Sequence, residues 1–211
     1  MADERPCIYV IAGTNGAGKS SIAGTALLLA GASYFNPDEA AKRILAANPG
    51  IGNDAANSAA WHEGKRLLKR AIAEHCNFAF ETTLGGNTIT ALLERALSAG
   101  LRVRIWYVGL NTVELHIKRV RARVERGGHD IPEPTIRRRF DSSRLNLIRL
   151  LPKVTELRMY DNSQEGDPET GHFPEPTFLL HVVHGTIVHQ CALADIPDWA
   201  KPVVAAARHA K

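Results

Sequence analysis

The sequence of 211 residues is poor in cysteine, in long apolar runs and in net charge. Its three cysteines, Cys7, Cys76 and Cys191, are an odd number and widely spaced, which favours reduced thiols over a disulfide framework. No apolar run approaches the roughly 18 residues that a membrane span requires, and the first residues are too polar and acidic for a signal peptide. We therefore expect a cytoplasmic protein with no membrane partner.

Aromatic residues are also scarce, at 6% of the chain. The tryptophans, Trp61, Trp106 and Trp199, are too scattered to predict a platform on which nucleic-acid bases would stack. The nine histidines show no spacing that is typical of metal ligands. With 45% hydrophobic and 23% charged residues, the composition is that of an ordinary globular domain, which excludes a disordered chain.

The net charge of +4 is small but unevenly distributed. Residues 118–144 carry nine basic and four acidic side chains, a local charge of +5, so the rest of the chain sums to −1. The basic residues are Lys118, Arg119, Arg121, Arg123, Arg126, Arg137, Arg138, Arg139 and Arg144. One basic segment on a near-neutral body predicts a local anion site, and we expect no nucleic-acid partner.

Short apolar runs alternate with helical patterns along the chain, which predicts an α/β fold around a mainly parallel sheet. The expected strands cover residues 7–12, 33–35, 78–80, 101–108 and 157–160, followed by a hairpin of 178–183 and 186–190. The expected helices cover residues 20–30, 55–75, 88–98, 112–126, 134–150 and 196–208, and another helix opens at Asn36. We expect a single domain over residues 1–211, with a helical lid excursion at about 112–150.

A glycine-rich loop follows the first expected strand and matches the phosphate-binding pattern G-x-x-x-x-G-K-[ST] without a substitution. Such glycines let backbone N–H groups cradle phosphate oxygens, and the dipole of the next helix adds to that field. Lys19 has the position that reaches the β- and γ-phosphates, and Ser20 that of a Mg²⁺ ligand. The expected ATP-binding residues are Gly13, Thr14, Asn15, Gly16, Ala17, Gly18, Lys19, Ser20 and Ser21. The fold prediction is therefore a three-layer P-loop NTPase sandwich that uses ATP and Mg²⁺.

Other motifs narrow the class of P-loop protein. The D-x-x-G and N-K-x-D motifs of switch GTPases do not occur, and neither does the L-S-G-G-Q signature of transporter ATPases. What remains is the plan of a small kinase, in which nucleotide lies on the loop, an acceptor lies at neighbouring strand ends, and an Arg-rich lid covers both.

Helical spacing divides residues 112–126 into three faces. The apolar face carries Val113, Ile117, Val120 and Val124. A charged face carries Glu114, Lys118, Arg121 and Glu125, which we expect to pair with one another along the helix. The third face carries Thr112, His116, Arg119, Arg123 and Arg126. Because no acid interrupts these arginines, the third face is predicted to lie against an anion.

The following helix contributes further basic side chains to the expected lid. Arg137 has the spacing to pair with Asp141, which leaves Arg138 and Arg139 without acidic partners. Residues 127–132, between the two helices, are a candidate hinge. A guanidinium neutralises a transferring phosphoryl group well, so we assign catalytic roles to Arg123, Arg126 and Arg138.

Phosphoryl transfer to a hydroxyl also needs a carboxylate that orients the hydroxyl and accepts its proton. Two acids follow strand ends, where ligands bind in open α/β sheets. Asp38 follows the second strand and is the candidate base. Glu81 ends the third strand and, with Thr83, is a candidate acceptor-binding residue. Asn36 has the position of a helix N-cap and is included with the acceptor-binding residues.

Several segments resemble the zeta-toxin family of P-loop kinases, in its shorter, stand-alone form. They are residues 11–20, 35–41 (FNPDEAA), 80–84 (FETTL), 123–132 (RVERGGHDIP), 136–140 (IRRRF), 160–163 (YDNS) and 197–200 (PDWA). The resemblance implies that Asp38 is the base, that Glu81 lies in the acceptor pocket, and that arginines among 123, 126, 138 and 139 stabilise the phosphate. It also implies a UDP-amino sugar as acceptor and a small antitoxin as partner.

Two other functions remain open at this point. A P-loop ATPase that acts as a switch on a protein partner would hydrolyse ATP without a small acceptor. A nucleic-acid-binding NTPase would use the basic helices, and its affinity would fall steeply with salt.

Overall fold

The computed structural model describes residues 5–19, 22, 34–166 and 174–209 of the chain. Its strands form one seven-stranded sheet in the order β2-β3-β1-β4-β5-β6-β7. The strands are β1 (Cys7–Ala12), β2 (Tyr34–Phe35), β3 (Phe78–Thr82), β4 (Arg102–Gly109), β5 (Glu156–Asp161), β6 (Thr177–Val183) and β7 (Thr186–Gln190). Strands β1, β2, β3, β4 and β5 run parallel to one another. The hairpin β6–β7 extends the sheet, and β6 is antiparallel to β5. The predicted α/β fold with a mainly parallel sheet and a late hairpin is confirmed.

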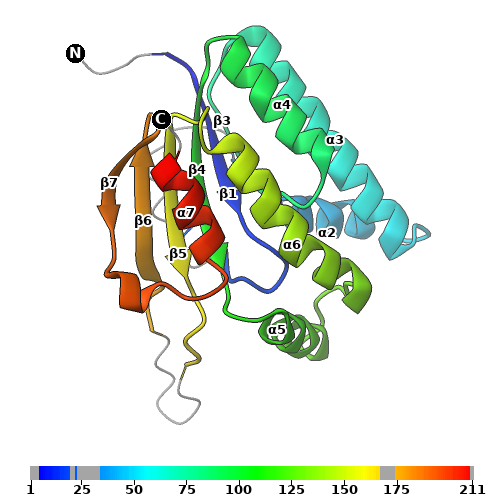
Figure 1. Cartoon of the computed structure of the whole chain (residues 1–211). Coiled ribbons are helices and arrows are strands. Elements are labelled where there is room, and N and C mark those ends of the chain that lie inside the picture. The colour runs from blue at the N-terminus through cyan, green and yellow to red at the C-terminus, as the bar shows by residue number, and fades with distance from the viewer. Residues whose placement is uncertain (1–4, 20–21, 23–33, 167–173, 210–211) are drawn as a thin grey trace.

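Helices α3, α4, α6 and α7 cover one face of this sheet, and α5 lies beyond the carboxyl ends of the strands (Figure 1). The helices are α2 (Pro37–Ala47), α3 (Asn53–Glu74), α4 (Asn87–Ser98), α5 (Val113–Glu125), α6 (Glu133–Leu150), η1 (Leu193–Asp195) and α7 (Lys201–His209). None of the helices in the described ranges is long and apolar enough to cross a membrane.

The side chains of β1 point alternately to the two faces of the sheet and contribute to the apolar cluster on each face. Ile8, Val10 and Ala12 face the main core, whereas Tyr9 and Ile11 face the opposite side. All six residues of β1 are buried, as expected for a central parallel strand. Because β3 and β4 flank this strand in parallel, the loop after Ala12 emerges between the ends of two neighbouring strands. That is the position at which ligands bind in such sheets.

Two predicted helices differ from expectation or lie outside the described ranges. The predicted helix 20–30 lies outside the described residues except for Ile22, which is helical. The closing helix was predicted from residue 196 but begins at Lys201. The preceding residues form turns because Trp199 is buried and its indole donates to Asp161 Oδ1 at 2.8 Å, which anchors them at the end of β5.

Helices α5 and α6, which are predicted to form a lid, differ in how they join the body of the protein. Leu147 and Leu150, in the second half of α6, belong to the main core. Helix α5 instead packs on the start of α6 through a separate apolar cluster of Ile117, Val120 and Ile136. The apolar spacing predicted for α5 therefore produces a small core of its own, at the carboxyl edge of the sheet.

Candidate active site

The phosphate loop after β1 has a backbone that requires glycine at several positions. Gly13, Gly16 and Gly18 have φ values of +145°, +82° and +80°. A Cβ at Gly13 would lie 2.2 Å from the backbone oxygen of Val108 in β4, and one at Gly16 would lie 2.6 Å from that of His116 in α5. The loop is thus pressed against two neighbouring elements, and its conformation is set by sterics as well as by sequence.

Lys19 ends the described part of this loop, and its ammonium donates to the Gly13 backbone oxygen at 3.1 Å. Burial lowers the pKa of Lys19, while the negative charges of Glu81 and Asp38 oppose that shift. An ammonium curled over the loop and facing two carboxylates is placed to exchange the Gly13 oxygen for phosphate oxygens. The predicted ligands Ser20 and Ser21 lie outside the described residues.

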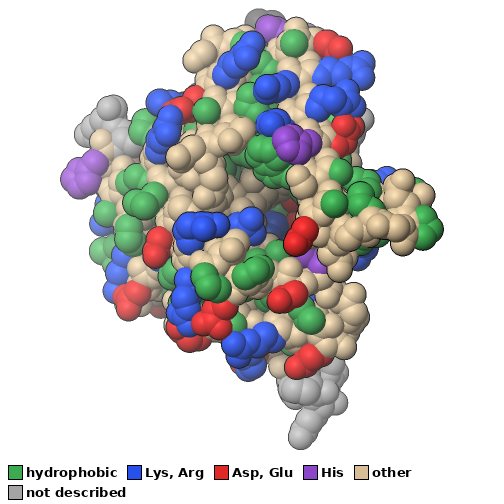
Figure 2. All heavy atoms as spheres, turned by 90° about the vertical axis from the view of Figure 1, so that its right-hand side faces the viewer, with side chains coloured by type: hydrophobic (Ala, Val, Ile, Leu, Met, Phe, Trp, Pro, Cys, Tyr) green, Lys and Arg blue, Asp and Glu red, His purple; other side chains and the backbone are tan. Residues whose placement is uncertain are grey.

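Beside the loop lies a cavity of about 380 Å³, which opens on the face shown in Figure 2 with Lys and Arg side chains on its rim. Its walls come from the phosphate loop, the start of α2, helix α3, the β3–α4 connection and the lid. The sequence-predicted residues that line it are Asn15, Lys19, Asn36, Asp38, Glu81, Thr83, Arg138 and Arg139. The structure therefore brings the predicted nucleotide and acceptor residues to one cavity.

Asp38 lies in the first turn of α2, where the Asn36 side chain accepts hydrogen bonds from the backbone N–H groups of Asp38 and Glu39. This confirms Asn36 as the N-cap. The Asp38 carboxylate lies 3.3 Å from Arg123 Nη1 and 3.8 Å from His129 Nε2. Burial lowers the pKa of His129, so its imidazole is predominantly neutral at pH 7. The main charge partner of Asp38 is therefore Arg123 of the lid.

Glu81, the penultimate residue of β3, is held by two side chains. The Tyr34 hydroxyl donates to Glu81 Oε1, and Asn36 Nδ2 donates to the same oxygen at 3.4 Å. Burial and the Glu81 charge raise the pKa of Tyr34, so that the hydroxyl stays a donor. Asn36 therefore serves both as cap of α2 and as a support for Glu81.

The connection after β3 is fixed by α6. Leu84 is buried with a φ of +54°, which turns the chain sharply. Ser143 Oγ donates to the Thr83 backbone oxygen at 2.6 Å, and Asn146 Nδ2 donates to that of Leu84 at 2.8 Å. These bonds tie the connection that carries Thr83, in the cavity wall, to the second half of α6.

The lid arginines separate into different environments. Arg123 donates to Asp38 and to the His129 backbone oxygen, and its buried Nε has no hydrogen-bond partner among the described residues. Arg138 lines the cavity, and it forms no hydrogen bond or ion pair within the described ranges. Arg126 is not in the cavity lining; its guanidinium donates to the Ala122 backbone oxygen at 3.0 Å.

Comparison with known proteins agrees with this arrangement. The family model described as "Zeta toxin" matches residues 1–165. The chain belongs to the zeta toxin family. An uncharacterized protein of Haemophilus influenzae is 34% identical over 132 residues, which are 61% of this chain and 88% of the relative. The family and the phosphate loop together indicate a nucleotide-dependent kinase that binds ATP.

Solved structures with the same fold include a two-component complex and a toxin–antitoxin system. A chain of the AvrRxo1-ORF1:-ORF2 complex with ATP has a TM-score of 0.65 at 16% identity, over 96% of this chain and 64% of that chain. This chain thus spans less than two thirds of the length of that relative. A chain of the PezAT system of Streptococcus pneumoniae has a TM-score of 0.58 at 12% identity, over 100% of this chain and 87% of that chain.

Several of the ion pairs that were predicted within single helices are not formed in this zeta toxin family member. Arg137 pairs with Glu133 and Glu114, whereas Asp141 pairs with Arg144. On the charged face of α5, Lys118 pairs with Glu165 and Arg121 with Glu133 rather than with acids of their own helix. The side chains reach acids on neighbouring segments because α5 and α6 lie together and residues 162–166 follow β5 beside α5.

The prediction that His116 belongs to an anion-binding face is also wrong. The side chain is 1% exposed, and Nδ1 lies 2.8 Å from the Asn15 backbone oxygen. Burial is the main cause that lowers the pKa of His116 to about 4, so its ring is neutral. Arg119 donates to the Gln164 backbone oxygen, so the predicted stripe of third-face residues does not form one surface.

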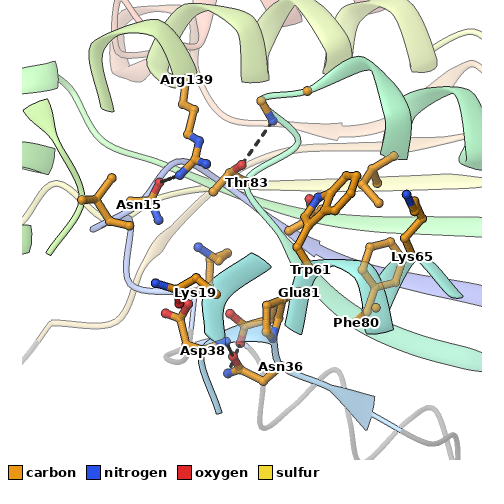
Figure 3. A pocket seen from close by; sticks show the side chains of 18 of the residues that line it. Asn15, Lys19, Asn36, Asp38, Trp61, Lys65, Phe80, Glu81, Thr83 and Arg139 are labelled. Atoms are coloured by element: carbon orange, nitrogen blue, oxygen red, sulfur yellow. Dashed lines mark hydrogen bonds between the residues drawn. The ribbon is translucent and has the colours of Figure 1, made fainter. Parts of the chain in front are cut away.

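The sequence analysis missed the wall that α3 contributes to the cavity. Asn57, Trp61, Gly64 and Lys65 recur at helical spacing and line one side, where the Lys65 ammonium lies 4.4 Å from the centre of the Trp61 ring (Figure 3). The wide spacing of the tryptophans along the chain gives no indication that Trp61 lines a cavity. The signal present was that Trp61 continues, about two turns before Leu68, the face of α3 that carries the buried Leu68 and Ile72.

No three His, Cys, Asp and Glu side chains of the described residues are grouped so as to hold a metal ion. Mg²⁺ in nucleotide sites is bound largely by phosphate oxygens and water, with one or two protein ligands. The glycine loop with Lys19 therefore fits a nucleotide phosphate, and the metal would enter with that nucleotide.

Proposed function

We propose that this protein is an ATP- and Mg²⁺-dependent phosphotransferase that phosphorylates a hydroxyl group of a small acceptor. The observation that carries the proposal is the single cavity in which Lys19 of the phosphate loop and the Asp38 carboxylate face the same space. A phosphate loop alone fits many functions. A loop that shares a cavity with a charged carboxylate and lid arginines fits phosphoryl transfer to a bound acceptor.

Nucleotide binding is assigned to the loop residues 13–21. Lys19 binds the β- and γ-phosphates, and backbone N–H groups around Gly16 and Gly18 bind the remaining oxygens. Ser20 is the proposed protein ligand of Mg²⁺, which when bound supplies positive charge to the phosphate oxygens.

Asp38 is the proposed base. It accepts the proton of the acceptor hydroxyl as the hydroxyl oxygen bonds to the γ-phosphorus and the bond from that phosphorus to the leaving ADP oxygen breaks. Arg123 and Arg138 neutralise the transferred group, and Arg139 borders the same space. Because Arg126 points to its own helix, we place it at the edge of the lid rather than at the phosphate.

The acceptor-binding residues proposed from the sequence are Asn36, Glu81 and Thr83, and the cavity extends past them to Trp61 and Lys65. An indole face binds planar rings, and an ammonium with no carboxylate partner in the described residues binds a negative charge. A UDP-amino sugar carries a planar base, two phosphates and free hydroxyls, and we propose this class of acceptor.

A small protein antitoxin is the proposed macromolecular partner. The similar folds of AvrRxo1 and PezAT come from a two-component complex and a toxin–antitoxin system, and both have low sequence identity to this chain. We propose a cytoplasmic setting for the pair, since both a metabolite acceptor and ATP are available there.

The test is incubation of the protein with ATP, Mg²⁺ and either UDP-N-acetylglucosamine or a metabolite extract, followed by mass spectrometry. We expect an acceptor heavier by one phosphate together with ADP, and neither product with Lys19→Met. Release of inorganic phosphate with no phosphorylated metabolite would contradict the proposal and favour an ATPase switch. Salt-sensitive binding of RNA or DNA without ATP would favour the nucleic-acid alternative.

A further inference from the structure

Asn15, in the middle of the phosphate loop, contacts both lid helices. Its backbone oxygen lies 2.8 Å from His116 Nδ1 in α5, and its side-chain Oδ1 accepts from Arg139 Nη1 of α6 at 2.8 Å. Figure 3 shows Arg139 reaching down from α6 onto Asn15. The Thr14 hydroxyl adds a bond of 3.3 Å to the Arg139 backbone oxygen. One residue of the loop therefore joins two helices that follow it by more than 90 positions in the chain.

The chemistry of His116 fixes the direction of its bond. A backbone oxygen only accepts, so the proton of the neutral ring must lie on Nδ1. The ring also lies edge-on to Phe140 of α6, with centroids 5.5 Å apart. Since His116 is 1% exposed, water does not compete for this bond while the loop is in place.

The packing of α5 determines how a movement of the phosphate loop affects this helix. Its apolar cluster with α6 is separate from the main core, so α5 meets the rest of the protein mainly through polar contacts, one of which is the buried bond of His116 to the phosphate loop. Gly16 also lies close to the backbone of His116, since a Cβ at Gly16 would be 2.6 Å from the His116 backbone oxygen. The loop and the helix therefore have no free space between them. A shift of the loop must therefore shift α5, which carries Arg123.

We infer that Asn15 is the joint through which nucleotide on the phosphate loop sets the position of the lid. His116 and Arg139 are positioning residues that transmit a movement of Asn15 to the lid helices. They thereby position Arg123 and Arg138 and do not take part in the reaction themselves. The inference rests on the proposed nucleotide site. Linkage makes the effect reciprocal, so loss of either contact lowers nucleotide affinity as well as lid order.

Hydrogen exchange of the full chain, with and without Mg²⁺ and adenylyl imidodiphosphate, tests this joint. In the wild-type protein we expect the nucleotide to slow exchange in α5 and the start of α6 about tenfold, in addition to the loop itself. His116→Leu retains the volume but not the donor, and we expect it to lose protection in α5 while the loop stays protected. His116→Asn, whose amide nitrogen replaces Nδ1, is expected to restore the protection of α5.

A second measurement is independent of the fold of the His116 variants. Asn15→Ala and Arg139→Lys, alone and combined, are compared by calorimetric binding of adenylyl imidodiphosphate. Each single variant is expected to weaken affinity about tenfold, and the double variant no more than either single one.

The outcomes separate this inference from the function on which it rests. Nucleotide binding with equal α5 protection in wild type and His116→Leu, or fully multiplicative losses in the double variant, would overturn the joint alone. Absence of nucleotide binding to the wild-type protein would overturn both the joint and the proposed kinase.

Discussion

Arg123 of helix α5 and Asp38 of helix α2 form an ion pair beside the cavity, which Asp38 lines and Arg123 does not, with 3.3 Å between Nη1 and Oδ2. In the proposed reaction these residues serve different atoms, because Asp38 faces the acceptor hydroxyl and Arg123 the transferred phosphate. Their pairing occupies both groups until substrates replace each partner. The half-exposed position of this pair keeps its own contribution to stability small.

Asp38→Asn is expected to abolish transfer and leave nucleotide affinity nearly unchanged. The amide cannot accept the hydroxyl proton, and loss of a positioned general base costs about 10²–10⁴-fold in kcat. Product formation measured by mass spectrometry, beside calorimetric nucleotide binding, checks this. Glu39→Gln, the neighbouring exposed acid paired with Lys42, is the matched control and should behave as wild type. Full turnover by Asp38→Asn would remove it as the base.

Arg123→Lys is expected to lower kcat at least about 100-fold, with little change in folding. The lysine keeps the charge but loses the planar fork that reaches Asp38, the His129 backbone oxygen and the phosphate together. Steady-state kinetics with a saturating acceptor measures the effect. Arg121→Lys, on the outer side of α5 and paired with Glu133, serves as control. An unaltered kcat would mean that Arg123 only holds Asp38 in the free protein.

The α3 wall should determine acceptor affinity and not nucleotide affinity. Trp61→Ala is expected to raise the KM for the acceptor about tenfold or more, since stacking on an aromatic ring is worth about 1–3 kcal/mol. Trp61→Phe should recover most of that loss. Lys65→Met should act in the same direction, whereas Lys69→Met, one turn further along the helix and exposed, should not. Equal changes in the KM for ATP would show that this wall does not act on the acceptor alone.

Buried, neutral His116 predicts a stability loss on acidification. Its pKa falls from 6.5 to about 4 on folding, so between those values the unfolded chain binds a proton that the folded protein does not. The free energy of unfolding should therefore fall as pH drops through this window and level off below it, by about 3 kcal/mol in all. Urea unfolding at pH 7.5 and pH 4.5 measures this.

A histidine substitution isolates the His116 contribution to that pH dependence. His116→Asn retains the donor without the titration and should flatten the curve. His184→Asn, at the exposed turn of the β6–β7 hairpin, is the control and should leave it unchanged. An identical slope in His116→Asn and wild type would show that other groups cause the acid sensitivity.

Local sequence was enough for the parts of the molecule that depend on local physics. The buried strand β1, the glycine loop that follows it and the cap at Asn36 are each specified by neighbouring residues, and the structure has them as predicted. The carboxyl ends of parallel strands meet at one edge, which is why Lys19, Asp38 and Glu81 could be expected to face one site.

Only the tertiary structure decided which side chains of the lid face the cavity. Helical spacing placed His116, Arg123 and Arg126 on one face of α5, yet the first is buried on Asn15, the second pairs with Asp38 and the third bonds to its own helix. Periodicity gives the direction of a side chain from its helix axis, but not the angle of that axis or the segments beside it. Contacts between distant segments, such as Trp61 in the cavity wall and Asn15 against α6, depend on that packing.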